Sequence, residues 1–142
     1  MAYKYTRKDN PESTTQQSRW RDFDLSFEKN PVTNDITVLT DQESIKQAVK
    51  NIVLTNFYER PFQPTLGTSL RDLLFEPMVP MTLVMIQKKV SIALRNFEPR
   101  INLEEVKATG DPDKNEIKIS IRFNIKDFIS STDVSVTLRR TR

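Results

Sequence analysis

The residue types in this chain leave carboxylates as its main means of acid–base chemistry. Histidine and cysteine are both absent from the 142 residues, which excludes a Ser-His-Asp triad, a thiolate nucleophile, a disulfide framework and a zinc finger. The two glycines, Gly67 and Gly110, lie far apart, so the chain has neither a P-loop nor a dinucleotide-binding fingerprint. An enzyme built from this sequence would depend on Asp, Glu, Lys, Tyr or Ser.

Three glutamates stand beside aromatic or proline residues and are the candidates for paired-carboxylate chemistry: Glu59, Glu76 and Glu98. Glycoside hydrolysis needs two carboxyl groups at a set separation, one of them with a raised pKa. The alternative is that each glutamate caps a helix or pairs with a neighbouring arginine. No spacing in the sequence selects a particular pair, so a structural role is favoured.

The charge balance is mildly basic, with 22 Lys and Arg against 19 Asp and Glu and a net charge of +3. Lys118, Arg122 and Lys126 fall on one side of an alternating segment that carries no aromatic residue on that side. Sheets that bind nucleic acids usually carry stacking aromatics among their cations. A solvated sheet face or a face for a protein partner is therefore preferred over a nucleic-acid-binding module, which stays an alternative.

The elements that would position these residues begin after a polar segment. Residues 1–20 lack periodicity and are expected to be an arm, and residues 21–142 are expected to form one domain. The alternation of Phe23, Leu25 and Phe27 predicts a half-buried strand, and the apolar run 36–39 predicts a second strand that closes a hairpin with a long loop.

The middle of the chain has the apolar spacing of helices. A first helix is expected to be capped at Thr40 or Asp41, to bury one face that extends to Phe57, and to end near Glu59, ahead of a proline. A short helix is expected over residues 70–75 with a cap at Thr68 or Ser69. A long helix is expected from about residue 82 to residue 97.

Strands return in the last third of the chain. One is expected from Ile101, and a turn follows at residues 110–115. Residues 116–126 then alternate without error between apolar and polar, and a last strand covers 133–139. The predicted order β-β-α-α-α-β-β-β gives a small α+β domain with helices packed on a mostly antiparallel sheet. The edges of that sheet could accept a strand from another chain, unless their Lys and Arg residues block pairing.

Two segments place an arginine and an aromatic residue beside a proline, which restricts the backbone. They are the run from Arg60 to Gly67 and the run from Arg95 to Ile101, which contains Glu98-Pro99-Arg100. A charged pair in a rigid turn at a helix end could dock another chain or lock the local fold, and physical reasoning leaves both open.

With the intervening Leu73-Leu74-Phe75-Glu76-Pro77-Met78, these segments resemble the baseplate wedge proteins of contractile phage tails. Those proteins are the sheath-initiator subunits, similar to the baseplate component of type VI secretion systems. The resemblance covers about residues 40–140 and is poor over the arm and first hairpin. It implies a non-enzymatic structural protein of the virion, present in the host cytoplasm during assembly. Some family members carry a lysozyme label, so a peptidoglycan hydrolase is a minority alternative.

The resemblance also implies partners: baseplate wedge proteins, the tail sheath protein and, as a further candidate, the tail tube, with no nucleic acid, membrane, metal or cofactor. Contact with the wedge core is carried onto Glu98, Pro99, Arg100, Arg60 and Phe62. Strand exchange with sheath subunits is carried onto Lys118, Ile119, Ser120, Ile121, Arg122, Phe123, Val134, Val136 and Leu138.

Overall fold

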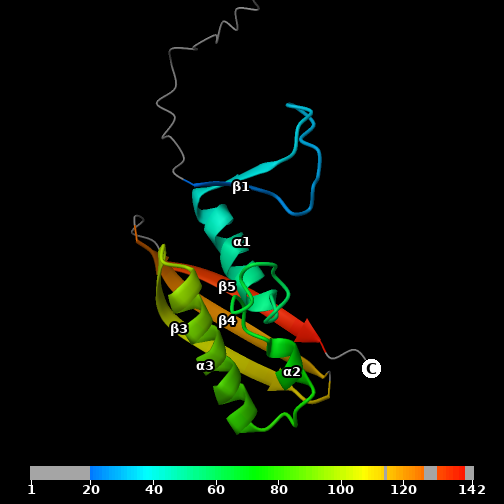
Figure 1. Ribbon diagram of the computed structural model, residues 1–142, viewed down its shortest axis with the longest axis vertical. Coiled ribbons are helices and arrows are strands. Elements are labelled where there is room, and N and C mark those ends of the chain that lie inside the picture. The colour runs from blue at the N-terminus through cyan, green and yellow to red at the C-terminus, as the bar shows by residue number, and fades with distance from the viewer. Residues whose placement is uncertain (1–19, 114, 127–130, 140–142) are drawn as a thin grey trace, which may run out of the picture. The chain divides into compact units, whose positions relative to one another are not determined.

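The computed structural model describes residues 20–113, 115–126 and 131–139, so the predicted arm lies outside the described residues except for Trp20. The element order is β-β-α-α-α-β-β-β, which confirms the predicted α+β fold (Figure 1). The elements are β1 (Arg21–Phe23), β2 (Val38–Thr40), α1 (Asp41–Leu54), α2 (Leu70–Leu74), α3 (Pro80–Phe97), β3 (Ile101–Asp111), β4 (Glu116–Ile125) and β5 (Ser131–Arg139).

Contacts within the chain form two compact units, Met1–Asp41 and Gln42–Arg142. The first contains the β1–β2 hairpin, and the second contains the helices and the three-stranded sheet. This division falls after Asp41. The boundary expected after residue 20 stays a prediction, because it adjoins residues that the structure does not describe.

The hairpin of the first unit is confirmed, but its first strand is shorter than predicted. β1 and β2 pair antiparallel, with Phe23 opposite Val38. The strand ends at Phe23 because Asp24 starts a turn: its side chain accepts a hydrogen bond from the Ser26 N–H and its carbonyl accepts one from the Phe27 N–H. Phe27 then has a positive φ of 53°. The expectation that alternating residues 23–27 form a half-buried face is wrong, since Phe23, Leu25 and Phe27 are all exposed.

Helix α1 buries Ile45, Val49, Ile52 and Val53, as its apolar spacing predicts. It ends at Leu54, five residues before the predicted end. The hydroxyl of Thr68 donates to the Val53 carbonyl, and the Thr68 N–H donates to the Thr55 carbonyl. A returning loop thus takes up carbonyls at the helix end, which terminates the helix.

The hydroxyl groups before α2 have a different role from the predicted one. Ser69 has a left-handed backbone (φ 48°) and makes no side-chain cap of α2. Its hydroxyl accepts a hydrogen bond from the Phe57 N–H, 2.9 Å away, across the loop. Phe57 itself is 42% exposed, so the prediction that it extends the buried face of the first helix is also wrong.

Helix α3 follows its prediction closely. It starts at Pro80, two residues earlier than expected, because proline suits the first turn of a helix, where its missing N–H costs no intrahelical bond. Its buried residues are Thr82, Ile86, Val90, Ala93 and Leu94, and the helix packs against β3.

The second unit is organised around β4, the central strand in the order β3-β4-β5, with both pairings antiparallel. The predicted alternation is confirmed: Ile117, Ile119, Ile121, Phe123 and Ile125 are at most 1% exposed. Helices α1 and α3 lie over this apolar face (Figure 1), and the polar side chains of β4 occupy the opposite face. A β-bulge between Leu103 and Glu105 interrupts the β3–β4 register.

Candidate functional site

The turn that follows α3 is built on a bidentate ion pair between two residues separated by one proline. Arg100 donates from Nε to Glu98 Oε1 at 2.6 Å and from Nη2 to Glu98 Oε2 at 2.7 Å. The Glu98 side chain is only 4% exposed, and that of Arg100 is 31% exposed. Two parallel charge-assisted bonds satisfy the carboxylate that the fold has removed from water.

The same turn is anchored to both layers of the unit by its backbone. The Glu98 N–H donates to the Leu94 carbonyl of α3, and the Arg100 carbonyl accepts a 3.0 Å bond from the Lys126 N–H just after β4. Pro99 is exposed between the two charged residues. The pair therefore locks the local fold, and it leaves the proline on a fixed outward surface.

Arg60 and Phe62, predicted to act with this turn, lie on the loop between α1 and α2 and are both exposed. Phe62 is completely exposed and has a left-handed backbone, with φ 67°. An aromatic residue in that region is strained and persists only when its surroundings fix it. Here the Tyr58 N–H donates to the Pro64 carbonyl at 2.8 Å, which closes the loop around Phe62.

Gly67 closes the base of that loop. Its φ is +123°, and a Cβ at this position would lie 2.4 Å from the Thr55 carbonyl oxygen. Only glycine permits both the conformation and this close approach of two backbone segments. The loop is thus held by backbone geometry, and it presents the Phe62 ring to solvent.

A pocket of about 420 Å³ separates the loop from α3. Its lining consists of Phe57, Thr65, Gly67, Thr68, Lys89, Ile92, Ala93, Asn96 and Phe97. None of the five residues predicted for wedge contact is in this lining, although the Arg60 loop and the helix that leads into the Glu98 turn form its two sides. Sequence reasoning missed this pocket, because its shape depends on the loop conformation that Gly67 permits.

The residues predicted to exchange strands are divided by the sheet. Ile119, Ile121, Phe123 and Val136 are buried, at 3% exposure or less. β4 is hydrogen-bonded to β3 on one side and to β5 on the other, so the prediction that residues 116–126 offer a pairing edge is wrong. Alternation in a sequence reports the two faces of a strand and does not report its position in the sheet. Among the described strands, β3 and β5 carry the outer edges.

The polar face of the sheet is a mixed-charge surface, not the basic stripe that its β4 residues suggest. Arg122 lies between Asp133 of β5 at 2.9 Å and Glu105 of β3 at 3.7 Å, and Arg139 pairs with Glu116 at 3.0 Å. The hydrogen bond with Asp133 and the charge of that carboxylate raise the pKa of the Arg122 guanidinium. Cross-strand pairing of this kind stabilises a sheet.

The carboxylates considered for hydrolysis occupy separate settings. Glu98 is held by Arg100, and Glu59 accepts a 2.8 Å bond from the Asn56 N–H of its own loop. Glu76 is exposed after α2. None of the three lines the 420 Å³ pocket. These three carboxylates therefore have separate settings and share neither a partner nor this pocket, unlike the paired carboxyl groups of glycoside hydrolases.

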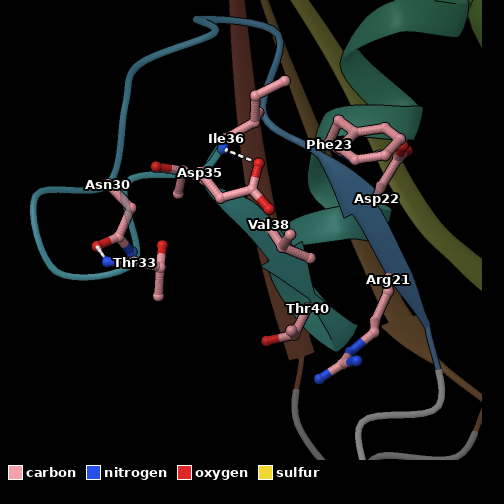
Figure 2. A pocket seen from close by; sticks show the side chains of 10 residues that line it. Arg21, Asp22, Phe23, Asn30, Thr33, Asp35, Ile36, Val38 and Thr40 are labelled. Carbon is pink, nitrogen blue, oxygen red and sulfur yellow. Dashed lines mark hydrogen bonds between the residues drawn. The ribbon is translucent and has the colours of Figure 1, made fainter. Parts of the chain in front are cut away.

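The hairpin unit contains a larger pocket, of about 600 Å³. Figure 2 shows Asn30 and Asp35 in this lining with their side-chain oxygens turned back onto neighbouring backbone N–H groups. Asn30 Oδ1 accepts from the Thr33 N–H at 3.3 Å, and Asp35 Oδ1 accepts from the Ile36 N–H at 2.7 Å. These two polar side chains thus serve the turns of the hairpin loop.

Two further findings concern only the described residues. They contain no group of three or more acidic side chains placed to hold a metal ion. No helix among them has the length and apolarity needed to cross a membrane.

The structural role of the ion pair between Glu98 and Arg100 can be tested by substituting each of the two residues. Arg100→Ala leaves a buried carboxylate without its partner, and we expect it to lower the free energy of unfolding by about 3 kcal/mol. Glu98→Ala leaves an arginine that can reach solvent and should cost less. Urea unfolding of both single variants and the double variant measures the coupling. Additive costs, with a coupling below about 0.5 kcal/mol, would contradict a pair that acts as one unit.

Comparison with known proteins identifies the family. The family model described as baseplate wedge protein gp25 matches residues 39–128. The baseplate wedge protein gp25 of Enterobacteria phage T4 is 34% identical over 93 residues, which cover 66% of this chain and 70% of the phage protein. The matched region includes α1, α2, α3, β3 and β4.

Solved structures agree on the fold. A proposed tail lysozyme from Geobacter sulfurreducens has a TM-score of 0.67 at 25% identity, over 75% of this chain and 97% of its own. A chain of the anti-feeding prophage baseplate has a TM-score of 0.59 at 15% identity, over 83% of both chains. A chain of the postcontracted pyocin R2 baseplate has a TM-score of 0.53 at 20% identity, over 82% of this chain and 97% of its own. With the sequence match over residues 39–128, these findings show that the chain belongs to the gp25 family of baseplate wedge proteins of contractile tails.

Proposed function

We propose that this protein is a non-enzymatic part of a tail baseplate that anchors to the wedge core and initiates the sheath. Family membership makes it a baseplate component of the virion tail. Anchoring is assigned to the turn of Glu98, Pro99 and Arg100 together with Arg60 and Phe62. The host cytoplasm is the expected site of its assembly, and the tail tube is a further candidate neighbour.

The observation that carries the anchoring proposal is the bidentate bond of a buried Glu98 to Arg100. A carboxylate already committed to two hydrogen bonds is a poor general acid or nucleophile. The same pair makes the turn that carries the exposed Pro99 rigid. A rigid turn favours association with a partner, because little side-chain and backbone motion is lost on binding.

Phe62 supplies the second part of the proposed anchor. Its ring is fully exposed on a loop that Gly67 and the Tyr58–Pro64 hydrogen bond hold in place. Aromatic and arginine side chains dominate the energetics of protein interfaces when they enter a pocket on the partner. Phe62 and Arg60 are residues of these two types, and both are exposed.

Sheath initiation is assigned to the outer edge of β5, because β4 is paired on both sides. A sheath arm that adds as a further strand would form hydrogen bonds between its own backbone and the backbone of β5. The contact would therefore be made by the backbone of the arm and not by its side chains. Val134 and Leu138 of β5 are half-buried on the apolar face, so an added strand could extend that face with apolar residues of its own.

The wedge anchor is tested by removing the ring without disturbing the fold. Phe62→Ala changes a side chain that contacts solvent, so its melting temperature should match wild type, while its affinity for the wedge proteins of its own baseplate should fall about tenfold or more. Gln63→Ala, on the same exposed loop, is the matched control. Wild-type affinity of Phe62→Ala, measured by biolayer interferometry, would refute the anchor.

The sheath edge can be located by disulfide trapping, since the chain contains no natural cysteine. Ser135→Cys on β5 and Ser120→Cys on β4 are directly opposed in register and both exposed. A strand added to β5 would lie about 5 Å from residue 135 and about 10 Å from residue 120, and only the first distance permits a disulfide. Cysteines scanned along the sheath arm should therefore trap Ser135→Cys alone.

The trapping experiment also has a result that opposes the proposal. Sheath that polymerises normally from the baseplate without any crosslink at residue 135 would remove β5 from sheath initiation. A separate assay tests the alternative that the protein is a peptidoglycan hydrolase. Peptidoglycan clearing by the wild type that is lost in Glu98→Gln or Glu59→Gln would show that the protein is an enzyme and not a purely structural component.

A further inference from the structure

Helix α3 has a second apolar face that is turned away from the sheet. Its core face is the buried set that includes Ile86, Val90 and Leu94. On the opposite side, four large apolar side chains are 47–68% exposed: Met81, Val84, Met85 and Ile92. The last three of these residues follow Met81 by three, four and eleven positions. This spacing places all four on one stripe, because an α-helix repeats every 3.6 residues. A helix that only covers a sheet needs one such face, so this second stripe requires its own explanation.

The charges on α3 are all of one sign. Lys88, Lys89 and Arg95 lie on the helix, and residues 80–97 include no Asp or Glu. None of the three cations forms an ion pair with another residue that the structure describes. Lys88 falls between Met85 and Ile92 on the apolar stripe itself, and Arg95 comes one turn after Ile92. The surface thus combines apolar contact with uncompensated positive charge.

The stripe runs into the 420 Å³ pocket. Ile92 belongs to both, and Lys89 lines the same pocket beside Phe57 and Phe97. A partner lying along α3 could insert one apolar side chain there and place a carboxylate near Lys89. Exposed methionines suit such contact, because their unbranched side chains adapt to the shape of a partner.

We propose that the outward face of α3 docks an amphipathic helix from another protein, with acidic residues flanking the apolar positions of that helix. Apolar side chains at i, i+3, i+4 and i+7 of the partner would lie along Met81, Met85 and Ile92. Carboxylates beside them would pair with Lys88 and Arg95. This surface is distinct from the Glu98 turn and from the β5 edge, and the proposal does not depend on either.

Charge complementarity selects this occupant over the others. A second copy of the chain would bring the same cations face to face, which is unfavourable. The chain's own residues 1–19 have four basic residues and two acidic ones, the wrong excess for this face. A lipid surface suits helices whose cations flank the apolar stripe. Here Lys88 stands within the stripe, where a carboxylate can pair with it and a hydrocarbon layer cannot.

The test uses the full chain and two labelled synthetic peptides of 18 residues, a length of about five helical turns. Both have leucines at the helical spacing above, one is flanked by glutamates and the other has lysine in place of each glutamate. Fluorescence anisotropy should show binding of the glutamate peptide and none of the lysine peptide. Lys88→Glu with Arg95→Glu should weaken the glutamate peptide about tenfold or more and should create binding of the lysine peptide.

Two further variants separate docking from general effects of charge and folding. Met85→Asp places a charge in the exposed stripe and should also weaken binding of the glutamate peptide about tenfold. Lys50→Glu with Arg71→Glu makes the same charge change at exposed positions on α1 and α2 and should leave binding at its wild-type value. Circular dichroism spectra that match wild type verify that each variant is folded.

Several results would overturn the proposal. They are equal binding of both peptides, binding of neither peptide, and a loss with the α1–α2 control variant as large as with the α3 variant. A dimer by sedimentation that Met85→Asp dissociates would assign the face to a second copy. Binding to phosphatidylglycerol vesicles that depends on Lys88 and Arg95 would assign it to a lipid surface.

Discussion

The second unit of this protein depends on the requirement that a buried carboxylate be paired. Glu98 is removed from solvent at the point where α3 ends, and Arg100 meets both of its oxygens two residues later, across Pro99. The backbone of the same three residues joins the last turn of α3 to the beginning of β3 and, through Lys126, to the end of β4. The ion pair thus stabilises the turn at which α3 passes into β3.

Local patterns predict the elements of this chain where side-chain burial alone determines structure. The alternation of residues 116–126 and the apolar spacing of α3 identify both elements almost to the residue, because each buries one regular face. The hairpin and α1 are predicted less well. Asp24 begins a turn inside an alternating segment. Thr68, fifteen residues further along the chain than Val53, donates to the Val53 carbonyl at the end of α1. Hydrogen bonds of these kinds end a strand or a helix before its apolar pattern ends, and the apolar spacing of the sequence does not reveal them.

Only part of the candidate site was predictable from the sequence, because local motifs are visible in a sequence and long-range contacts are not. The Glu-Pro-Arg turn and the loop of Arg60 and Phe62 are visible as motifs, and the structure adds that Glu98 is buried while Phe62 is exposed. The position of β4 between two strands could not be predicted, because strand order is a long-range property. The pocket beside Ile92 depends on a loop held by Gly67, which also lies outside what periodicity reports.

We assign partner contacts to three outward surfaces of the second unit: the turn with its neighbouring loop, the β5 edge and the outer stripe of α3. The most direct test of the account is a cryo-EM map of the assembled baseplate at side-chain resolution. We predict that Pro99 and Phe62 are buried against wedge proteins while Glu98 and Arg100 keep their bidentate bond. A map in which both residues face solvent, or in which a partner opens the ion pair, would contradict the account.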